Sequence, residues 1–487
     1  MRSTKLTAIT LAVLLAMTAV SCGSNDSIRT DSATDNSDTS DSETTSGKLT
    51  DSVPALDFKE AEFRTIEQIS NANPIGLEES DGDVVNDAVY ESQRRTEERF
   101  NVKILPTTLV DYNEISLTIN KMVMSGSNDY DLIFGQMFKS GSDAQNGIFM
   151  DWNTLPYVEF SNPWYIKSIK EATVGDKLYM LESEMSMTYH KQTWLIVYNK
   201  TKAKEIPDFP DLYKTVDSGE WTIDYLNKLT ADVYRDLNGD SQKDDEDFYG
   251  ILGSNDGCML ASFVSGCEGK LVELNNDLEV VTQINSEKTL DILTKLSKLF
   301  MSNEGALQRK ETSRAYRMKK FVNGNVLFEA MQVNDLVNPE FGMREIKDEY
   351  GVLPLPKYSN TQEEYYTMVD GGASVMLIPT TAQNTEMIGA IVEAMSCDYY
   401  YNVTPVYTGI AIEQKGTRDD ESIRMIRQIL DSRIINFAYL YDGFSGWVLK
   451  LGNIIRDENT IVSTIASNMD SVTAYYESTI NYLTAAE

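Results

Sequence analysis

The sequence predicts an α/β chain of more than one lobe with a helical C-terminal third. The chain has 487 residues, 41 % of them hydrophobic, which is enough for roughly two to four units with ordinary cores. Between residues 63 and 395, short apolar runs alternate with amphipathic stretches, as in strands joined by crossover helices in parallel sheets. Beyond residue 420 the apolar spacing is mostly helical.

In chain order, the spacing predicts individual elements. Helices are expected over residues 84–100, 115–124, 221–234, 288–300, 385–395, 422–430 and 460–483. Strands are expected over residues 102–105, 130–134, 179–181, 194–198, 326–328, 351–355 and 375–378. The stretch from Phe63 to Ile69 has apolar residues at a spacing of three, so it is ambiguous, and we assign it as a strand.

The first 22 residues have the pattern of an export signal. Arg2 and Lys5 precede an apolar run from Leu6 to Val20, which spans about 22 Å as a helix and is too short to cross a bilayer. The segment 19–23 (Ala-Val-Ser-Cys-Gly) resembles the bacterial lipobox, although Ala19 stands where Leu is usual. We therefore predict a lipoprotein signal peptide over 1–21, acylation of Cys22, and anchoring at the extracellular face of the cytoplasmic membrane. The alternative is an ordinary secretory signal with an incidental cysteine.

Residues 22–52 are mostly Ser, Thr, Asp and Asn, with few apolar side chains. Such a segment buries too little surface to offset its ordering entropy, so we predict disorder. Its position after an acylatable Cys22 favours a tether between membrane and body over a low-complexity tail without function.

Charge argues against several classes of partner and site. The chain carries 75 Asp and Glu against 43 Lys and Arg, a net charge of −32. Binding to nucleic acid or to anionic lipid head groups needs an excess of basic residues, so neither is expected, and membrane contact is predicted through the anchor only. Self-repulsion favours a soluble monomer. His190 is the sole histidine, which argues against His-rich metal sites and Ser-His-Asp catalysis.

Three cysteines remain in the body. Cys258 and Cys267 are nine residues apart in an exported chain, so a local disulfide is an open alternative to two free thiols. Cys397 ends an apolar helical pattern and is predicted to lie in the core.

Several segments together resemble the extracellular solute-binding proteins of ABC importers, in the carbohydrate-type family 1. The similarity spans roughly residues 57–487 and depends on the order of the segments more than on any one of them. The segments that carry it are 86–102, 129–134 (Asp-Tyr-Asp-Leu-Ile-Phe), 195–200 (Leu-Ile-Val-Tyr-Asn-Lys), 221–224, 321–328, 350–357 and 403–407.

The resemblance implies a two-lobed, periplasmic-binding-protein-like fold of type II with a ligand cleft between the lobes. Its N-lobe would comprise 53–186 plus 352–403, and its C-lobe 190–345 plus 404–487. The crossings between lobes are expected near 186–192, 346–352 and 402–406. The two lobes would close about a hinge around a small ligand, and the importer would recognise this closed conformation.

The resemblance also implies a function without catalysis: a lipid-anchored subunit that captures a carbohydrate and delivers it to ABC permease subunits. Two alternatives stay open. One is a carbohydrate-active enzyme, because paired carboxylates suffice for glycoside hydrolysis. The other is a surface adhesin that binds glycans without handing them on.

Sugars are held by aromatic faces and by carboxylates or amides, and such groups belong at strand ends that face the cleft. The predicted ligand-binding residues are Gln136, Glu184, Asp370, Trp447 and Trp164. For each tryptophan the alternative is packing in the core.

Residues 236–247 have the spacing of an EF-hand-type calcium loop. Ser241 replaces the usual Gly at position 6, and Asp247 the longer Glu at position 12. We predict a structural Ca²⁺, with an acidic surface turn as the alternative. The predicted ligands, at positions 1, 3, 5, 7, 9 and 12, are Asp236, Asn238, Asp240, Gln242, Asp244 and Asp247.

Overall fold

The computed structural model describes residues 49–69, 75–111, 113–166, 168, 172–307, 313–409 and 419–485. The predicted signal peptide, Cys22 and most of the predicted tether lie outside the described residues. Residues 50–487 form one unit, and the fold below is that of its described part. In the same ranges, every helix is too short or too polar to cross a membrane.

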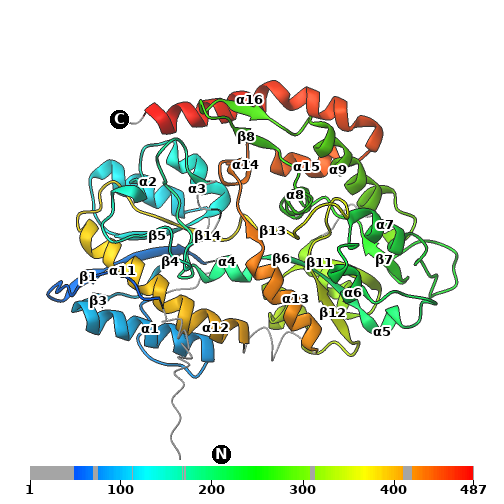
Figure 1. The fold of residues 1–487 in the computed structure, drawn as a ribbon, viewed down its shortest axis with the longest axis horizontal. Coiled ribbons are helices and arrows are strands. Elements are labelled where there is room, and N and C mark those ends of the chain that lie inside the picture. The colour runs from blue at the N-terminus through cyan, green and yellow to red at the C-terminus, as the bar shows by residue number, and fades with distance from the viewer. Residues whose placement is uncertain are drawn as a thin grey trace, which may run out of the picture. The chain divides into compact units, whose positions relative to one another are not determined.

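The first of two main sheets has four strands in the order β14-β5-β2-β4 (Figure 1). Strands β2, β4 and β5 are parallel, whereas β14 runs antiparallel to β5. Ser374 is paired with Gln136 at the end of this antiparallel pair. The strands are β2 (Thr65–Gln68), β4 (Thr108–Val110), β5 (Leu132–Gln136) and β14 (Ser374–Leu377).

The second main sheet has five strands in the order β10-β7-β11-β6-β12. β6 is antiparallel to both of its neighbours, and the other pairs are parallel. The strands are β6 (Trp194–Asn199), β7 (Tyr249–Leu252), β10 (Ala306–Leu307), β11 (Val326–Gln332) and β12 (Tyr350–Leu353). Three two-stranded sheets complete the set: β1 (Ala61–Phe63) with β3 (Val102–Ile104), β8 (Val272–Leu274) with β9 (Val280–Thr282), and β13 (Thr367–Met368) with β15 (Arg433–Ile434).

Helices surround both sheets. Those before β6 are α1 (Val84–Phe100), α2 (Ile115–Ser125), α3 (Met137–Ala144) and α4 (Met187–Lys191). Those between β6 and β12 are α5 (Lys200–Ala203), α6 (Leu212–Asp217), α7 (Ile223–Ala231), α8 (Gly257–Gly266), α9 (Glu287–Ser297) and α10 (Arg314–Val322). The last group is α11 (Thr385–Asp398), α12 (Thr404–Val406), α13 (Asp420–Asp431), α14 (Phe437–Leu440), α15 (Leu451–Ile454) and α16 (Ile461–Ala485).

Local sequence explains where these helices begin and end. The Asp83 carboxylate accepts from the N–H groups of Val85 and Asn86 and so caps α1, which ends at Asn101 in the left-handed conformation (φ 48°). Val89 and Phe100 are buried along one face of α1. α1 therefore has the bounds that its spacing predicts.

Three connections between the two sheets lie side by side. The α4 segment leads into β6, β13 lies on the way from β12 to β14, and β15 follows α13. Thr193 bridges to Val369, and Thr367 is paired with Arg433, so the three segments contact one another through their backbones. A connection at 346–352 is not observed, because Tyr350–Leu353 pairs with β6 inside the second sheet. The chain leaves that sheet after Leu353.

Three further predictions from the sequence can be compared with the structure. The first sheet is mixed, not all parallel, because β14 returns antiparallel beside β5. Residues 179–181 form no strand and make only an isolated bridge from Leu181 to Met376. Cys258, Cys267 and Cys397 are free thiols, and Cys397 is buried as predicted.

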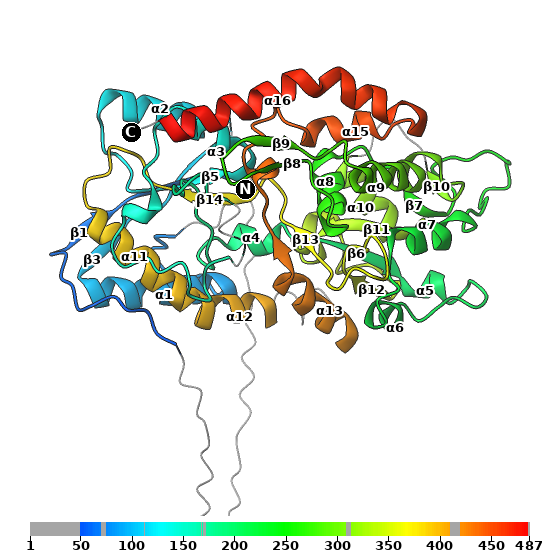
Figure 2. The ribbon, with the colours of Figure 1, turned by 45° about the horizontal axis from the view of Figure 1, so that its top comes forward.

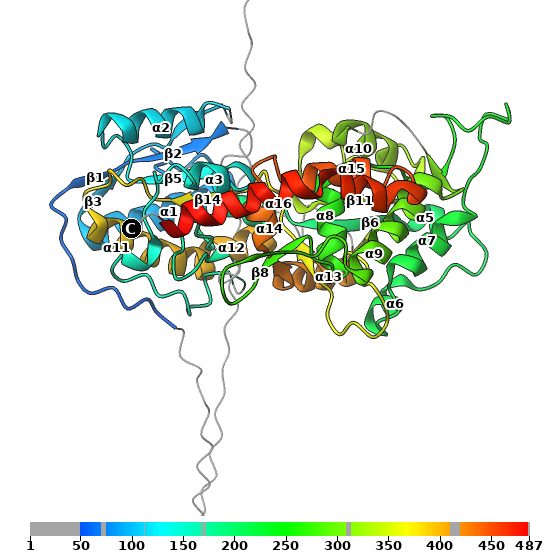
Figure 3. The ribbon, with the colours of Figure 1, turned by 90° about the horizontal axis from the view of Figure 1, so that it is seen from above.

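The C-terminal helix α16 extends past both sheets (Figures 2 and 3). At the middle of the helix Thr473 lies 3.2 Å from Thr282 of β9 through their hydroxyl oxygens. Nearer its C-terminal end Thr479 accepts a hydrogen bond of 2.7 Å from Gln145, the residue after α3. α16 therefore contacts both β9 and the end of α3.

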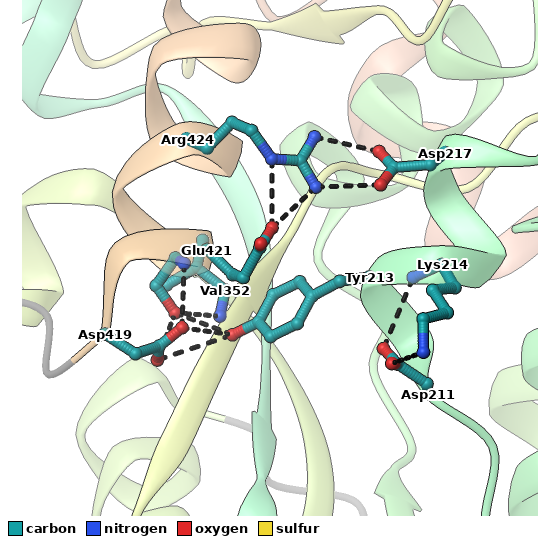
Figure 4. Close-up of polar contacts among 9 residues, drawn as sticks. Asp211, Tyr213, Lys214, Asp217, Val352, Asp419, Glu421 and Arg424 are labelled. Carbon is teal, nitrogen blue, oxygen red and sulfur yellow. Dashed lines mark hydrogen bonds and ion pairs between the residues drawn. The ribbon is translucent and has the colours of Figure 1, made fainter.

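A polar cluster attaches α13 to the second sheet (Figure 4). The buried Ser422 hydroxyl accepts from Val352 N at 3.1 Å and lies 2.8 Å from the Tyr213 hydroxyl. On the exposed side, Arg424 donates two hydrogen bonds to Asp217, at 2.8 and 3.0 Å. The cluster thereby fixes the helix from which the chain enters β15.

Replacing Ser422 with alanine is expected to lower the free energy of unfolding by about 1–3 kcal/mol, because Val352 N–H would stay buried without an acceptor. Arg424→Ala removes only half-exposed ion pairs and should cost about 1 kcal/mol or less. Urea denaturation of both variants checks the difference. Equal losses would contradict the role of the buried hydroxyl.

Candidate ligand-binding site

Four glutamines and one aspartate gather where several strands and connections end. Gln68 ends β2 and donates to Gly372 O at 2.8 Å, and Gln136 ends β5 beside Ser374. Gln192 and Gln332 approach from the second sheet: Gln332 ends β11, and Val333 N donates to Thr193 O at 2.9 Å. Asp370 N donates to Gln192 O at 2.9 Å. We call Gln68, Gln136, Gln192, Gln332 and Asp370 the amide site.

Several polar atoms of the amide site have no partner among the described residues. They are Oε1 of Gln136, Nε2 of Gln192 and Oε1 of Gln332, although Gln192 and Gln332 are each only 3 % exposed. A buried amide atom without a hydrogen bond destabilises the folded protein. A bound polar molecule that forms a hydrogen bond with this atom removes that destabilisation. The arrangement therefore suits a ligand with several hydroxyl or amine groups.

The loop at Gly371 and Gly372 brings the site's groups close together. A Cβ atom on Gly372 would lie 2.8 Å from Gln192 Oε1 and 3.2 Å from Asp370 Oδ1, so both side chains lie against Gly372. Gly372 N donates to Asp370 Oδ1 at 2.9 Å. Burial, and next the nearby Asp256 carboxylate, raises the pKa of Asp370 to about 6.

Aromatic side chains border this loop. Phe138, in the first turn of α3, packs against Gly371, and its ring centroid lies 4.8 Å from that of Phe444. Tyr439 accepts a hydrogen bond of 2.5 Å from Gly371 N and lies edge-on to Phe138. Phe444 is 46 % exposed and has a left-handed backbone (φ 64°), a conformation that costs free energy outside glycine.

Two of the five predicted ligand-binding residues, Gln136 and Asp370, belong to the amide site. Trp447 is 0 % exposed and packs in the core, so in this conformation its ring offers no face to a ligand. The exposed aromatic of the same segment is Phe444, which is not among the predicted residues. The left-handed Gly443 before it is the signal that could have indicated a strained, outward-facing turn.

Trp164 and Glu184 lie elsewhere, at a cavity of about 600 Å³. Tyr189, Tyr400 and Arg433 also line this cavity, which shares no residue with the amide site. Trp164 itself is fully buried behind the surface of the cavity.

The Glu184 carboxylate is part of a buried chain of polar groups between connections. Its Oε2 lies 2.9 Å from His190 Nε2 and accepts from the Thr404 hydroxyl at 2.6 Å. Arg433 Nη1 lies 3.0 Å from His190 Nδ1, and its guanidinium carbon is 4.1 Å from the Tyr189 ring centroid. Because arginine only donates, a neutral His190 accepts at Nδ1 and carries its proton at Nε2, beside the Glu184 carboxylate.

The pKa values agree with that assignment. Burial lowers the pKa of His190, which favours the neutral ring. Burial alone would raise the pKa of Glu184, but His190, Arg433 and Thr404 outweigh it and bring the pKa to about 2. His190 is thus a hydrogen-bonding residue beside the first connection.

The predicted calcium loop has its carboxylates turned to backbone N–H groups. Asp236 accepts from Gly239 at 2.6 Å and from Ser241 at 2.8 Å, and Asp247 accepts from Leu237 at 3.0 Å. Ser241 has φ 61°, the left-handed conformation that glycine adopts at this loop position. Within the described ranges, no three His, Cys, Asp or Glu side chains are arranged to hold a metal ion. The calcium site stays a prediction.

No protein-family model matches the chain, and no curated protein matches it in sequence. Solved structures do match. A cyclo/maltodextrin-binding protein bound to maltotetraose has a TM-score of 0.53 at 12 % identity, over 88 % of this chain and 97 % of the other. An ABC substrate-binding protein of Listeria monocytogenes in complex with cycloalternan has a TM-score of 0.51 at 12 % identity, over 88 % and 98 %. The chain has the fold of ABC substrate-binding proteins.

A third match is an ABC transporter solute-binding protein of Thermotoga lettingae bound to α-D-tagatose, with a TM-score of 0.51 at 13 % identity, over 87 % of this chain and all of the other. The predicted two-lobed α/β fold with a helical C-terminal region is confirmed. In an ABC substrate-binding fold the two main sheets are the centres of the two lobes, and residues of the amide site come from both.

Proposed function

We propose that this chain is the substrate-binding subunit of an ABC importer, that it captures a carbohydrate at the amide site, and that it delivers the sugar to a permease without altering it. The observation that supports this most strongly is the set of buried, unpartnered amide atoms contributed from both sheets. Hydroxyl groups of a sugar would satisfy these atoms. Similar folds have been solved with maltotetraose, cycloalternan and tagatose bound.

A thermal-shift screen over mono- and oligosaccharides tests the proposal. A sugar that binds the native state and not the unfolded state should raise Tm by an amount that grows with sugar concentration. Gln192→Leu should abolish the shift with little loss of stability, because Nε2 has no partner to lose. Gln283→Leu is the matched control and should keep the shift. Gln283 is a half-buried residue directly after β9, and its side-chain amide donates to Glu273. Sugar turnover during incubation would favour an enzyme.

The lipid anchor belongs to the same proposal. Acylation of Cys22 would hold the body at the extracellular face of the cytoplasmic membrane, with residues 22–52 as the tether. Metabolic labelling with an alkyne-modified fatty acid should mark the wild type, and Cys22→Ser should be unlabelled and released from membranes. Labelling that survives the substitution would contradict the anchor.

A structural Ca²⁺ at 236–247 remains part of the proposal. Millimolar Ca²⁺ should then raise Tm, and the rise should disappear in Asp240→Asn. Asp277→Asn, an exposed aspartate in the turn between β8 and β9, is the control. If Ca²⁺ leaves Tm unchanged, the segment is an acidic surface turn.

A further inference from the structure

The amide site contains one carboxylate without a cationic partner of its own. Among the described residues Asp370 forms no ion pair, and the one hydrogen bond to its carboxylate comes from Gly372 N. Burial costs an isolated carboxylate part of its hydration. An ion pair with a positively charged ligand would compensate for the lost hydration.

The cations nearest to Asp370 are occupied by other acids. Arg314 pairs with the buried Asp335, whose Oδ2 also accepts from Gln332 N at 2.8 Å. Arg317 lies between two acids, 3.7 Å from Asp256 and 3.6 Å from Glu329. Neither guanidinium group therefore forms an ion pair with Asp370, and the unpaired carboxylate disfavours an anionic ligand and favours a cationic one.

The hydrogen-bonding groups are compatible with an amine. Oε1 of Gln136, Oε1 of Gln332 and Nε2 of Gln192 have no partner among the described residues. An ammonium group offers three donors, so it can bind amide oxygens as well as the Asp370 carboxylate. The exposed Phe444, against Phe138, adds an aromatic face that attracts a cation as well as sugar C–H groups.

We propose that the captured ligand is an amino sugar, or an oligosaccharide that contains one, and that its protonated amine binds the Asp370 carboxylate while its hydroxyls bind the glutamine side chains. This deepens the proposed function and depends on it. Asp370 then decides specificity, because it distinguishes an aminated sugar from its N-acetylated or hydroxyl counterpart.

Isothermal titration calorimetry at about pH 7 with matched sugars tests this inference. The probes are glucosamine and chitosan oligosaccharides, compared with glucose, N-acetylglucosamine and N-acetylated chito-oligosaccharides of equal length. The aminated member of each set should bind roughly tenfold or more tightly, since a charge-assisted hydrogen bond replaces a neutral one. Asp370→Asn should remove that preference, and Asp277→Asn should keep it.

The outcomes separate the inference from the function. If neutral and acetylated sugars bind as tightly as aminated ones, or if Asp370→Asn keeps the preference, the amine is not recognised, while sugar capture stands. If neither aminated nor non-aminated sugars bind, and circular dichroism and a cooperative thermal transition show that the protein is folded, both proposals fail.

Discussion

Replacing Trp447 with alanine is expected to lower the free energy of unfolding by about 3–5 kcal/mol, the usual cost of truncating a fully buried tryptophan. Backbones come unusually close around this residue. A Cβ on Gly257 of α8 would lie 2.4 Å from Val448 O, and one on Gly446 would lie 2.2 Å from the Tyr476 hydroxyl of α16. Trp447 thus sits between two helices that cannot move inward to fill a cavity. Guanidinium denaturation measures the loss.

Phe444→Ala, three residues earlier, is the matched control. Because Phe444 is 46 % exposed, its removal should change stability by about 1 kcal/mol or less while weakening binding of the sugar found in the screen. The opposite pattern, with a stable Trp447→Ala that loses binding and a Phe444→Ala that retains it, would restore Trp447 as the ligand-facing aromatic.

Glu184→Gln is the second substitution with a large expected effect. At neutral pH it removes the carboxylate that lies against the neutral His190 ring and near the Arg433 guanidinium, which should cost about 3 kcal/mol, the free energy that the lowered pKa represents. Glu205→Gln, at an exposed carboxylate that also pairs with an arginine, should cost about 1 kcal/mol or less.

The same carboxylate makes stability depend on pH. In the folded state the pKa of Glu184 is about 2, below its ordinary value of 4.5, so its contribution is complete above 4.5 and is lost as pH falls toward 2. That loss is about 3 kcal/mol, since one pKa unit corresponds to about 1.4 kcal/mol. The lowered pKa of His190 adds a loss of the same sign below about pH 6.5, because the unfolded chain takes up the proton first.

Unfolding curves of the wild type and of Glu184→Gln, measured between about pH 7 and pH 3, test this dependence. Buried acids with raised pKa values, among them Glu329 and Asp442, contribute in the opposite sense in both proteins, so the comparison isolates Glu184. The difference in the free energy of unfolding between the two proteins should shrink as pH falls below 4.5. An acid limb in Glu184→Gln as steep as in the wild type would show that other carboxylates govern it.

Much of the fold could be predicted from short-range signals. α1 and α2 have strong helical spacing, and β6 is a continuous apolar run, so each was predicted to within about one residue. Short strands escaped detection because pairing, not local sequence, forms them. β13 and β15 have two residues each and are strands only because they pair with one another. Likewise nothing local indicates that Tyr350–Leu353 pairs with β6 and not with the first sheet.

The candidate site was predictable only beside a recognisable strand. Gln136 follows the predicted strand 130–134, and Asp370 lies on the loop before the predicted strand 375–378. Gln68, Gln192 and Gln332 are isolated amides in unremarkable stretches, and their convergence depends on the order of strands in both sheets. The tryptophan in the segment after Asp442 was the natural candidate by residue type, but the turn at Gly443 directs Phe444 outward and leaves Trp447 inside.

The helix α16 has a mechanical consequence. Its 25 residues make a rod of about 37 Å that contacts Thr282 through Thr473, Gln145 through Thr479 and Tyr179 through Leu483. A change in the angle between the sheets would bend this rod, slide it or break some of these attachments. α16 therefore resists such a change, and loss of the Gln145 attachment, as in Thr479→Val, should weaken that resistance in part, because the hydrogen bond from Tyr179 remains.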